Sequence, residues 1–396
     1  MRILYLVHNV SWKGGGIFFT AFHQARHLVA RGHDVTLMSI SPRSRWAFAE
    51  REVSGVRLVE SPDLLWGKAR TGWDLWDALA RIIRLRSGTF DLVHGFESRP
   101  AVTLPAFALR RTRGVPVILT WADWFGRGGK SAERGRFLGL AMGPLESFCE
   151  EYFFPRADRC ITMGEPLTER AVSIGVRPDR ILNLLHGCDT QGIDPLPIQE
   201  ARARLGQLPR TGIVLGYLGA LRPTTAQLLL DAFQMIRKQV PRPCSLVLIG
   251  NHKLRLRDYL SDTSREGVFE TGWISYNEVG KYLAACDLLL LPLKKSVATD
   301  NVWPSKLNDY LAAGRPVVAT DMRVLEPVFQ EHEVGLLTAD TSEEFARGCV
   351  ELLQNDAMRE QMGRNARSLA EGDLSWDRIV DRLEILYMKV VHNDGD

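Results

Sequence analysis

The sequence lacks the cysteine patterns that mark metal sites and disulfide-rich domains. Its 396 residues include six cysteines, none in a C-x-x-C pair and none at a Cys/His spacing typical of zinc sites. Scattered cysteines of this kind fit buried thiols in a reducing cytoplasm. No apolar run approaches the roughly 18 residues that a membrane-spanning helix needs, and the apolar start ends at His8, too early for a signal peptide. We therefore expect a cytoplasmic protein without a membrane-spanning segment.

The chain also lacks a strong net charge, which stands at +3. Proteins that bind nucleic acid through its phosphates ordinarily carry a basic surplus, so no nucleic-acid partner is expected. The charge is uneven, because residues 1–190 hold 26 Lys and Arg against 19 Asp and Glu, a surplus of +7. This basic half could meet phosphates or an anionic membrane surface, or its charges could simply be solvated.

Apolar runs that alternate with helical stretches predict an α/β fold with two domains. Ile3–Val7 is typical of a buried parallel strand, and a Gly-rich turn, a helix over Phe18–Ala30 and a strand over Val35–Ile40 follow it. This β–loop–α–β order opens a doubly wound sheet. A linker over 190–198, with Gly and Pro, precedes a second series of the same kind. The chain length suits two domains of ~200 residues each.

The segment most informative about function runs over 301–316. Pro304 and Ser305 mark a helix start, where free backbone N–H groups and the helix dipole attract a phosphate. Lys306 adds a full positive charge in the first turn. Asp309 lies one turn further along the same face, where a carboxylate can bind ribose hydroxyls. One short element could thus hold both ends of a nucleoside diphosphate; the alternative is a surface helix with an ordinary Lys–Asp pair.

The same segment resembles the signature of glycosyltransferase family 4, a group of retaining enzymes with the GT-B fold. The family pattern, roughly P-S-K-L-x-E-Y-x-A-x-G-x-P-V-V-A-T, stands at 304–320 as PSKLNDYLAAGRPVVAT. Other stretches that are similar to the family cover nearly the whole chain in the family's order. They are the glycines at 15 and 16, RGHDV at 31–35, FDLVH at 90–94, ADRCIT at 157–162, LHGCD at 185–189, LLLDAF at 228–233, LVLIG at 246–250, and Trp376 with Tyr387.

The resemblance implies two Rossmann-like domains that face each other across a cleft. The acceptor domain would be 1–190, joined by a closing helix over 377–396 that crosses back to it, and the nucleotide-sugar domain would be 191–376. The resemblance also implies a set of donor-binding residues, most of them in the second domain. They are Gly15, Gly16, Gly219, Arg222, Gly250, Trp273, Asn301, Ser305, Lys306, Leu307 and Asp309.

Two departures from the family pattern bear on the donor site. The family usually has two glutamates spaced E-x7-E near the donor sugar, and Asn301 and Asp309 stand at that spacing. Asp309 can still bind hydroxyls, whereas Asn301 carries no charge. The family often has a phosphate-binding Arg and Lys after the strand that ends at Gly219, where this chain has only Arg222 as a basic residue. Lys306 is therefore expected to carry more of the diphosphate charge than usual.

In the first domain, Asp123 is the candidate group for handling the acceptor hydroxyl. It follows Thr120-Trp-Ala, where many family members carry Thr-x-His, and Ala122 takes the position of the histidine. An acidic group at the C-terminal edge of a strand could orient the hydroxyl or accept its proton, or it could only cap the following loop.

Aromatic and basic residues of the first domain suggest how an acceptor is held. Rings flanking the predicted cleft could stack on an acceptor, and a strand-end histidine could reach it. These acceptor-side candidates are Trp12, His94, Trp121 and Trp124. Basic residues over Arg127–Arg159 surround an apolar run at 137–142, and this segment could rest on anionic lipid or pack on its own domain.

Together these patterns predict a retaining glycosyltransferase that moves a sugar from a nucleotide diphosphate sugar, taken to be a UDP-sugar, to an acceptor hydroxyl. Asp123 and Lys306 are the predicted catalytic residues. The acceptor would be a saccharide, a lipid-linked intermediate or a small aglycone, with peripheral contact at the inner membrane face as an option. No Asp-x-Asp motif stands in a suggestive place, so no metal ion is expected, and no cofactor beyond the nucleotide sugar. Two alternatives remain: a sugar-nucleotide epimerase and a non-catalytic protein that binds nucleotide sugars.

Overall fold

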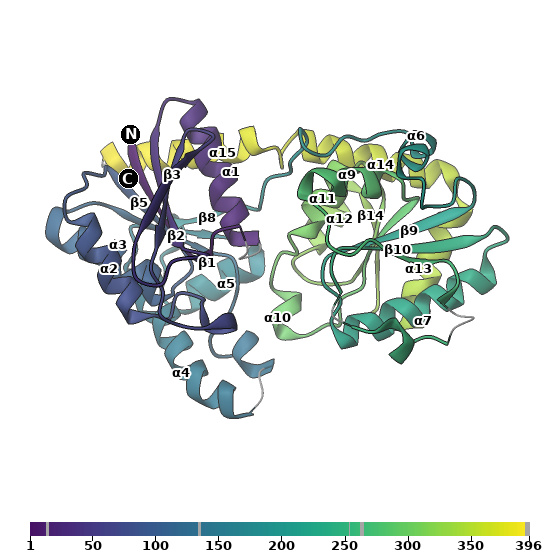
Figure 1. The fold of residues 1–396 in the computed structure, drawn as a ribbon, viewed down its shortest axis with the longest axis horizontal. Helices are drawn as coiled ribbons and strands as arrows, with labels where there is room; N and C mark the ends of the chain where they lie inside the picture. Colours follow the sequence, from purple (N-terminus) through teal and green to yellow (C-terminus); the bar gives the residue numbers. More distant parts are fainter. Residues whose placement is uncertain (13–15, 134–135, 253, 262–264, 393–396) are drawn as a thin grey trace. The chain divides into compact units, whose positions relative to one another are not determined.

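The structure is a computed structural model that describes residues 1–12, 16–133, 136–252, 254–261 and 265–392 (Figure 1). The chain divides into two compact units. Unit 1 contains Met1–His186, Asn301–Trp303 and the last helix, and unit 2 contains Gly187–Asp300 and Pro304–Ser375. The predicted domain boundary, after residue 190, lies a few residues beyond the division at His186.

Unit 1 is built on one sheet whose described strands run in the order β3-β4-β2-β1-β5-β6-β7-β8. Neighbouring strands are parallel except β3 and β4, which form an antiparallel edge. The strands are β1 (Arg2–Val10), β2 (Asp34–Ile40), β3 (Ala49–Val53), β4 (Val56–Ser61), β5 (Leu92–Phe96), β6 (Val117–Trp121), β7 (Arg159–Thr162) and β8 (Ile181–Asn183). The helices are α1 (Gly16–Ala30), α2 (Leu75–Leu85), α3 (Pro100–Arg113), α4 (Arg136–Phe153), α5 (Glu165–Ser173) and α15 (Trp376–His392).

The central strand β1 contains a continuous run of apolar residues in the core of unit 1. Ile3 to Val7 are fully buried, because helices cover both faces of a parallel sheet and no face is left for polar residues. Helix α1 packs on β1 and β2, and α15 packs on α1. The Oη atoms of Tyr5 and Tyr387 lie 2.7 Å apart, which ties α15 to β1.

Unit 2 repeats the design with an all-parallel sheet in the order β11-β10-β9-β12-β13-β14 over its described strands. The strands are β9 (Ile213–Leu218), β10 (Cys244–Ile249), β11 (Val268–Glu270), β12 (Leu288–Leu291), β13 (Val317–Thr320) and β14 (Gly335–Thr338). The helices are α6 (Ile198–Leu205), α7 (Pro223–Gln239), α9 (Tyr276–Ala284), α10 (Val297–Asp300), α11 (Lys306–Ala312), α12 (Glu326–His332), α13 (Ser342–Gln354) and α14 (Asp356–Glu371). The two sheets with their flanking helices confirm the predicted α/β class.

The parallel strands decide where functional groups gather in each unit. Because their carboxyl ends share one edge of a sheet, residues far apart in sequence meet there. In unit 1, Glu97 directly follows β5, and Asp123 comes shortly after the end of β6. In unit 2, Gly219 follows β9 and Gly250 follows β10. In the described part of the chain, no helix combines the length and apolar character needed to cross a membrane.

Candidate active site

In unit 2, the segment predicted to hold a diphosphate forms the short helix α11, whose first residue is Lys306. Lys306 Nζ donates a hydrogen bond to Tyr217 Oη at 3.0 Å and lies 4.2 Å from the centroid of that ring. Burial, with a further contribution from the positive charge of Arg222, lowers the pKa of Lys306 to about 7. The ammonium group is poorly solvated and close to a second cation, so a bound anion would stabilise its charged form.

Two glycines leave space beside Lys306. Gly219 directly follows β9 with φ +97°, and a Cβ atom there would lie 3.4 Å from Lys306 Nζ. Gly250 follows β10 with φ +117°, and a Cβ atom there would lie 3.6 Å from the backbone of Gly219. Positive φ favours glycine, and the absence of side chains allows phosphate oxygens to approach the backbone. Arg222 is the N-cap of the 17-residue helix α7, whose free N–H groups add positive potential.

Asp309 lies one turn after Lys306 on α11 and accepts a hydrogen bond from Tyr276 Oη at 2.9 Å. Burial raises the pKa of Asp309 to about 7; the hydrogen bond from Tyr276 opposes this rise, and the charge of Asp189 adds to it. A carboxyl group in this state gains stabilisation from additional hydroxyl donors, which vicinal ribose hydroxyls would supply. The structure thus gives the predicted ribose contact a carboxylate with one donor already in place.

Three further residues of the predicted donor site lie in unit 2: Ser305 just before α11, Leu307 on α11, and Trp273 before α9. Ser305, the N-cap of α11, is exposed and its side chain makes no capping hydrogen bond. Leu307 is fully buried, so only its backbone could meet a ligand. Trp273 precedes α9 and is 80% exposed, which leaves its ring free to stack on a planar group.

The remaining donor-side predictions are not in unit 2. Gly15 lies outside the described residues, and Gly16 is the first residue of α1. Asn301 is buried, and its contacts assign it to unit 1. Of the donor set, the structure therefore brings one group together in unit 2, namely Gly219, Arg222, Gly250, Lys306 and Asp309.

In unit 1, Asp123 follows β6 at the carboxyl edge of the sheet. Its Oδ1 atom pairs with Lys130 Nζ at 2.6 Å, and both side chains are about one-third exposed or less. The backbone N–H groups of Ala122 and Asp123 donate to Glu97 Oε1 at 2.8 and 2.9 Å. Asp123 is therefore held at two points: Lys130 pairs with its carboxylate, and the carboxyl group of Glu97 accepts its backbone N–H.

Glu97 is the most unusual residue at this edge, and the sequence did not single it out. It is fully buried, and its φ of +72° is rare for a residue with a Cβ atom. Burial and the nearby charge of Asp123 raise the pKa of Glu97 well above its ordinary value. Its Oε2 atom has no hydrogen-bond partner in the described part of the chain. The buried carboxyl group of Glu97 thus supports the Asp123 loop through its Oε1 atom.

Two histidines share the electrostatic environment of Asp123. Burial lowers the pKa of His8 to about 3 and that of His186 to about 4, while the charge of Asp123 acts in the opposite direction on both. His186 Nδ1 lies 2.6 Å from Thr20 Oγ1. Both rings are neutral at pH 7, so they can exchange hydrogen bonds with a hydroxyl group but cannot supply positive charge.

Two of the acceptor-side predictions belong to the core of unit 1. His94 is fully buried, with Nδ1 2.5 Å from Tyr387 Oη and Nε2 2.6 Å from Thr120 Oγ1. Trp121 is also fully buried and stacks on Phe154 with ring centroids 4.4 Å apart. Because β5 and β6 are covered on both faces, neither side chain has exposed surface for contact with an acceptor.

The other two tryptophans keep accessible ring surface. Trp12 is 38% exposed and packs edge-on against Phe18 and Phe22, with ring centroids 5.0 Å apart in each pair. Trp124 is half-buried one residue after Asp123, and the guanidinium of Arg170 lies 5.2 Å from its ring centroid. These two rings remain the acceptor-stacking candidates.

Comparison with known proteins decides the family. Residues 212–355 match the family described as Glycosyl transferases group 1, and residues 15–184 match the Glycosyl transferase 4-like domain. The chain belongs to the group 1 glycosyltransferases. Membership of this family favours a transferase over the predicted alternative of a non-catalytic binding protein.

Curated relatives match only part of this glycosyltransferase. The putative teichuronic acid biosynthesis glycosyltransferase TuaH of Bacillus subtilis (strain 168) is 30% identical over 164 residues, which are 39% of each chain. An uncharacterized glycosyltransferase of Methanocaldococcus jannaschii is 21% identical over 167 residues, which are 41% of this chain and 42% of the relative. The chain thus spans less than half the length of the curated relatives it matches.

Solved structures match the glycosyltransferase over nearly its whole length. Sucrose-phosphate synthase from Thermosynechococcus elongatus has a TM-score of 0.80 at 18% identity, covering 99% of both chains. Anabaena HepE in complex with UDP has a TM-score of 0.70 at 17% identity, covering 98% of this chain and 100% of HepE. WaaG, a glycosyltransferase involved in lipopolysaccharide biosynthesis, has a TM-score of 0.70 at 17% identity, covering 97% and 99%. At such identities the likeness concerns the fold, and it confirms the predicted GT-B class.

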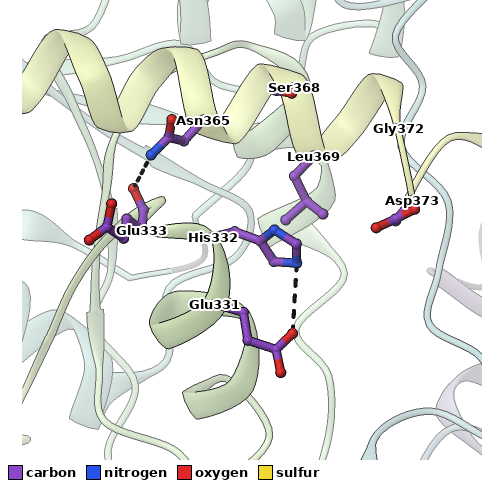
Figure 2. A pocket seen from close by; sticks show the side chains of 8 residues that line it. All are labelled: Glu331, His332, Glu333, Asn365, Ser368, Leu369, Gly372 and Asp373. Atoms are coloured by element: carbon purple, nitrogen blue, oxygen red, sulfur yellow. Dashed lines mark hydrogen bonds and ion pairs between the residues drawn. The ribbon is translucent and has the colours of Figure 1, made fainter.

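Away from these residues, unit 2 of the glycosyltransferase has an open hollow of about 400 Å³ between the end of α12 and α14 (Figure 2). Asn365 Nδ2 donates to the carbonyl oxygen of Glu333 at 3.2 Å across it. The lining residues are Glu331, His332, Glu333, Asn365, Ser368, Leu369, Gly372 and Asp373. None of the predicted site residues is among them, so the hollow has no part in the donor or acceptor assignments.

Three residues that the sequence did not single out contact predicted site residues: Tyr217, Tyr276 and Glu97. Each is separated from its partner by at least 25 residues of chain, so no local spacing links them. Of the three, only Glu97 could have been identified from the sequence, because it follows a buried strand, as Asp123 does.

Proposed function

We propose that this glycosyltransferase moves a sugar from a UDP-sugar to an acceptor hydroxyl with retention of the anomeric configuration. The observation that carries the proposal is the grouping of Lys306, Arg222 and Asp309 beside two glycines at the carboxyl edge of the unit 2 sheet. Two cations neutralise the charge that develops on the diphosphate leaving group, so the reaction needs neither a metal ion nor a cofactor. The uridine base is supported by the similar fold of HepE, whose structures contain UDP and UDP-glucose.

On the acceptor side, Asp123 orients the acceptor hydroxyl or accepts its proton. Glu97 acts as a positioning residue, because its Oε1 atom holds the two backbone N–H groups of the Asp123 loop. Trp12 and Trp124 offer ring surface on which a planar or apolar part of the acceptor stacks.

We propose a saccharide acceptor that is presented on a lipid at the inner membrane face. TuaH is named for teichuronic acid biosynthesis, and WaaG for lipopolysaccharide biosynthesis. The surplus of +7 in residues 1–190 and the basic segment Arg127–Arg159 support peripheral contact of a cytoplasmic enzyme with that membrane. A small soluble aglycone would use Trp12 and Trp124 without requiring this contact.

Exchange of Asp309 for asparagine tests the ribose contact. Asp309→Asn retains the shape of the side chain but removes the charge that strengthens hydrogen bonds from hydroxyl groups, so we expect about a tenfold loss of UDP affinity or more. Isothermal titration with UDP measures the loss, and the thermal unfolding midpoint without ligand monitors the fold. Affinity equal to that of the wild type would show that the ribose lies elsewhere.

Exchange of Glu97 tests its positioning role. Glu97→Ala leaves two backbone N–H groups without their acceptor, and we expect transfer to fall about tenfold or more while UDP affinity is retained. Glu97→Gln should recover most of the activity, because the amide oxygen can accept hydrogen bonds from the same two backbone N–H groups. Steady-state kinetics separate kcat from KM for both variants. If glutamine is as damaging as alanine, the side chain acts through its charge instead.

A screen of nucleotide sugars tests the overall proposal. Thermal shift identifies the stabilising donor, and release of the nucleoside diphosphate then reports turnover. Dependence of this release on an added acceptor separates a transferase from an epimerase, which needs no acceptor.

A further inference from the structure

Two loops at the carboxyl edge of the unit 1 sheet each present an exposed tryptophan. Residues 41–48 connect β2 to β3 and contain Trp46, and residues 62–74 follow β4 and contain Trp66. Because β3 runs antiparallel to β4, both loops lie at the same edge of the sheet. The two indoles are 74% and 76% exposed, whereas Trp121 at the end of β6 is fully buried. Tryptophan is largely buried in most proteins, so two indoles this exposed indicate a binding surface.

Contacts between the two loops hold the ring of Trp66 in place. The guanidinium of Arg45 lies 3.4 Å from the centroid of the Trp66 ring and donates to the carbonyl oxygen of Leu65 at 2.6 Å. Arg70 donates to the carbonyl oxygen of Ser41, which joins the loops a second time. Arg45 covers one face of a ring that is still 76% exposed, so the opposite face is open. A ring fixed in this way loses little conformational freedom when a ligand stacks on it.

Trp66 is the first of three accessible indoles along this edge. The strands that carry them lie in the order β4-β2-β1-β5-β6. Trp66 follows β4, Trp12 follows β1 and Trp124 follows β6, so successive indoles follow strands that are two positions apart. Neighbouring strands lie about 4.8 Å apart, which places these strand ends about 10 Å from one another and spreads them over about 20 Å. A ligand that contacts all three rings must therefore be extended.

The middle indole is tied to the β3–β4 hairpin that also orients the two loops. The guanidinium of Arg51, on β3, lies 5.9 Å from the centroid of the Trp12 ring. Arg51 pairs with Glu60 of β4 at 2.7 Å, and the buried Glu60 also accepts a hydrogen bond from Ser11 Oγ, next to Trp12. The positions of Trp12 and Trp66 are thus both set by contacts with this end of the sheet.

The composition of the two loops favours a sugar over a bilayer or a protein partner. In the described parts of residues 41–48 and 62–74, the exposed large apolar side chains are the two indoles, and no aliphatic side chain joins them. Entry of the Trp66 ring into hydrocarbon would also take the Arg45 guanidinium out of water, at a large cost. A sugar ring suits both groups, because its C–H face packs on an indole and its hydroxyl oxygens accept from guanidinium N–H groups.

We propose that the carboxyl edge of the unit 1 sheet binds a chain of several sugar units. Trp66 and Arg45 form a subsite remote from Asp123, and Trp12 lies along the edge between them. The proposal rests on the proposed function, in which Asp123 meets the acceptor hydroxyl, and it makes the acceptor an oligosaccharide instead of a single sugar or a small aglycone. Contact at Trp66 then adds affinity for long acceptors without touching the reacting atoms.

Saccharide binding by matched variants tests the proposal. Synthetic saccharides from single sugars to hexasaccharides, in a neutral series and a uronic-acid series, are immobilised on an array as probes. The test variant is Trp66→Ala. The control is Tyr152→Ala, because Tyr152 is 40% exposed and also carries an arginine, with the Arg156 guanidinium 3.9 Å from its ring centroid. Tyr152 lies at the end of α4, toward the start of β7 and hence toward the opposite edge of the sheet.

We expect the wild type and the control to bind hexasaccharides of one series about tenfold more tightly than disaccharides, and Trp66→Ala to lose most of this gain. Trp66→Phe, which retains a flat ring, should recover part of it. In transfer assays the loss should lie in KM for long acceptors, with kcat unchanged. Binding in the neutral series assigns Arg45 to hydroxyl groups, and binding in the uronic-acid series assigns it to carboxylates; both outcomes support the subsite.

Three outcomes overturn the subsite. They are affinity that does not increase with saccharide length in either series, wild-type length dependence in Trp66→Ala, and a Trp66-dependent sedimentation with phosphatidylglycerol vesicles in the absence of saccharide binding. The UDP thermal shift separates this proposal from the proposed function. A normal UDP shift without length-dependent binding contradicts the subsite alone, whereas length-dependent binding without any UDP shift contradicts the proposed function alone.

Discussion

Asp123→Asn is expected to reduce sugar transfer by about 10²–10⁴-fold, the range typical for loss of a general base. The amide preserves the size of the side chain, but it cannot accept a proton from the acceptor hydroxyl. The Ala122 and Asp123 backbone contacts to Glu97 remain, so the loop should keep its place. The loss should therefore lie in kcat, with UDP affinity nearly unchanged.

Asp179→Asn is the matched control for this experiment. Asp179 also lies in unit 1 and pairs with a basic side chain, Arg177, at 2.6 Å, but it lies away from the strand edge that carries Asp123. We expect the control to transfer sugar at the wild-type rate. Full activity of Asp123→Asn would leave Asp123 with only a loop-capping role and would remove the acceptor assignment.

Lys306→Ala should weaken UDP binding by about 10- to 150-fold, because a buried charge-assisted contact contributes roughly 1.5–3 kcal/mol. Turnover should fall as well, since the lysine stabilises the leaving diphosphate. The pH dependence gives a second signature. The free enzyme must bind a proton at Lys306 to meet the diphosphate, and its pKa is about 7. Wild-type affinity should therefore decrease as the pH rises above 7, and Lys306→Ala should lack this decrease.

Titration calorimetry with UDP in two buffers of different ionisation enthalpy measures both effects. Wild type should take up protons on binding above pH 7, and the variant should take up fewer. Lys294→Ala is a suitable control, because Lys294 lies in unit 2 and forms a surface ion pair with Asp340 at 3.2 Å. Equal UDP affinity of Lys306→Ala and wild type would contradict the placement of the diphosphate on α11.

The elements that the sequence predicted well are those with a strong local pattern. The run Ile3–Val7 predicted the buried strand β1, and the apolar run at 213–218 coincides with β9. Helix α3 was not predicted, and it contains an internal proline, Pro105, which ordinarily argues against a helix. The edge strand β3 consists mostly of exposed polar residues, so neither alternation nor an apolar run marks it.

The candidate site was predictable where one segment carries the whole pattern. Lys306 and Asp309 stand three residues apart on a helix start, and their shared environment could be expected from that spacing. Tyr217 and Tyr276 could not, because they reach these residues from a strand and a helix that only the folded sheet brings near. His94 shows the opposite error: a histidine at the end of a strand was expected to reach a ligand, but α15 and β6 enclose its ring. Burial of this kind depends on elements distant in sequence.

The most direct test of the central claim is transfer of labelled sugar from a panel of UDP-sugars to saccharide and lipid-extract acceptors, measured together with UDP release. The account predicts that one donor gives acceptor-dependent release in equal amounts with transferred label. It also predicts that Lys306→Ala and Asp123→Asn both abolish most of this signal. A wild-type enzyme that is stabilised by UDP-sugars but neither releases UDP nor transfers label with any acceptor would contradict it.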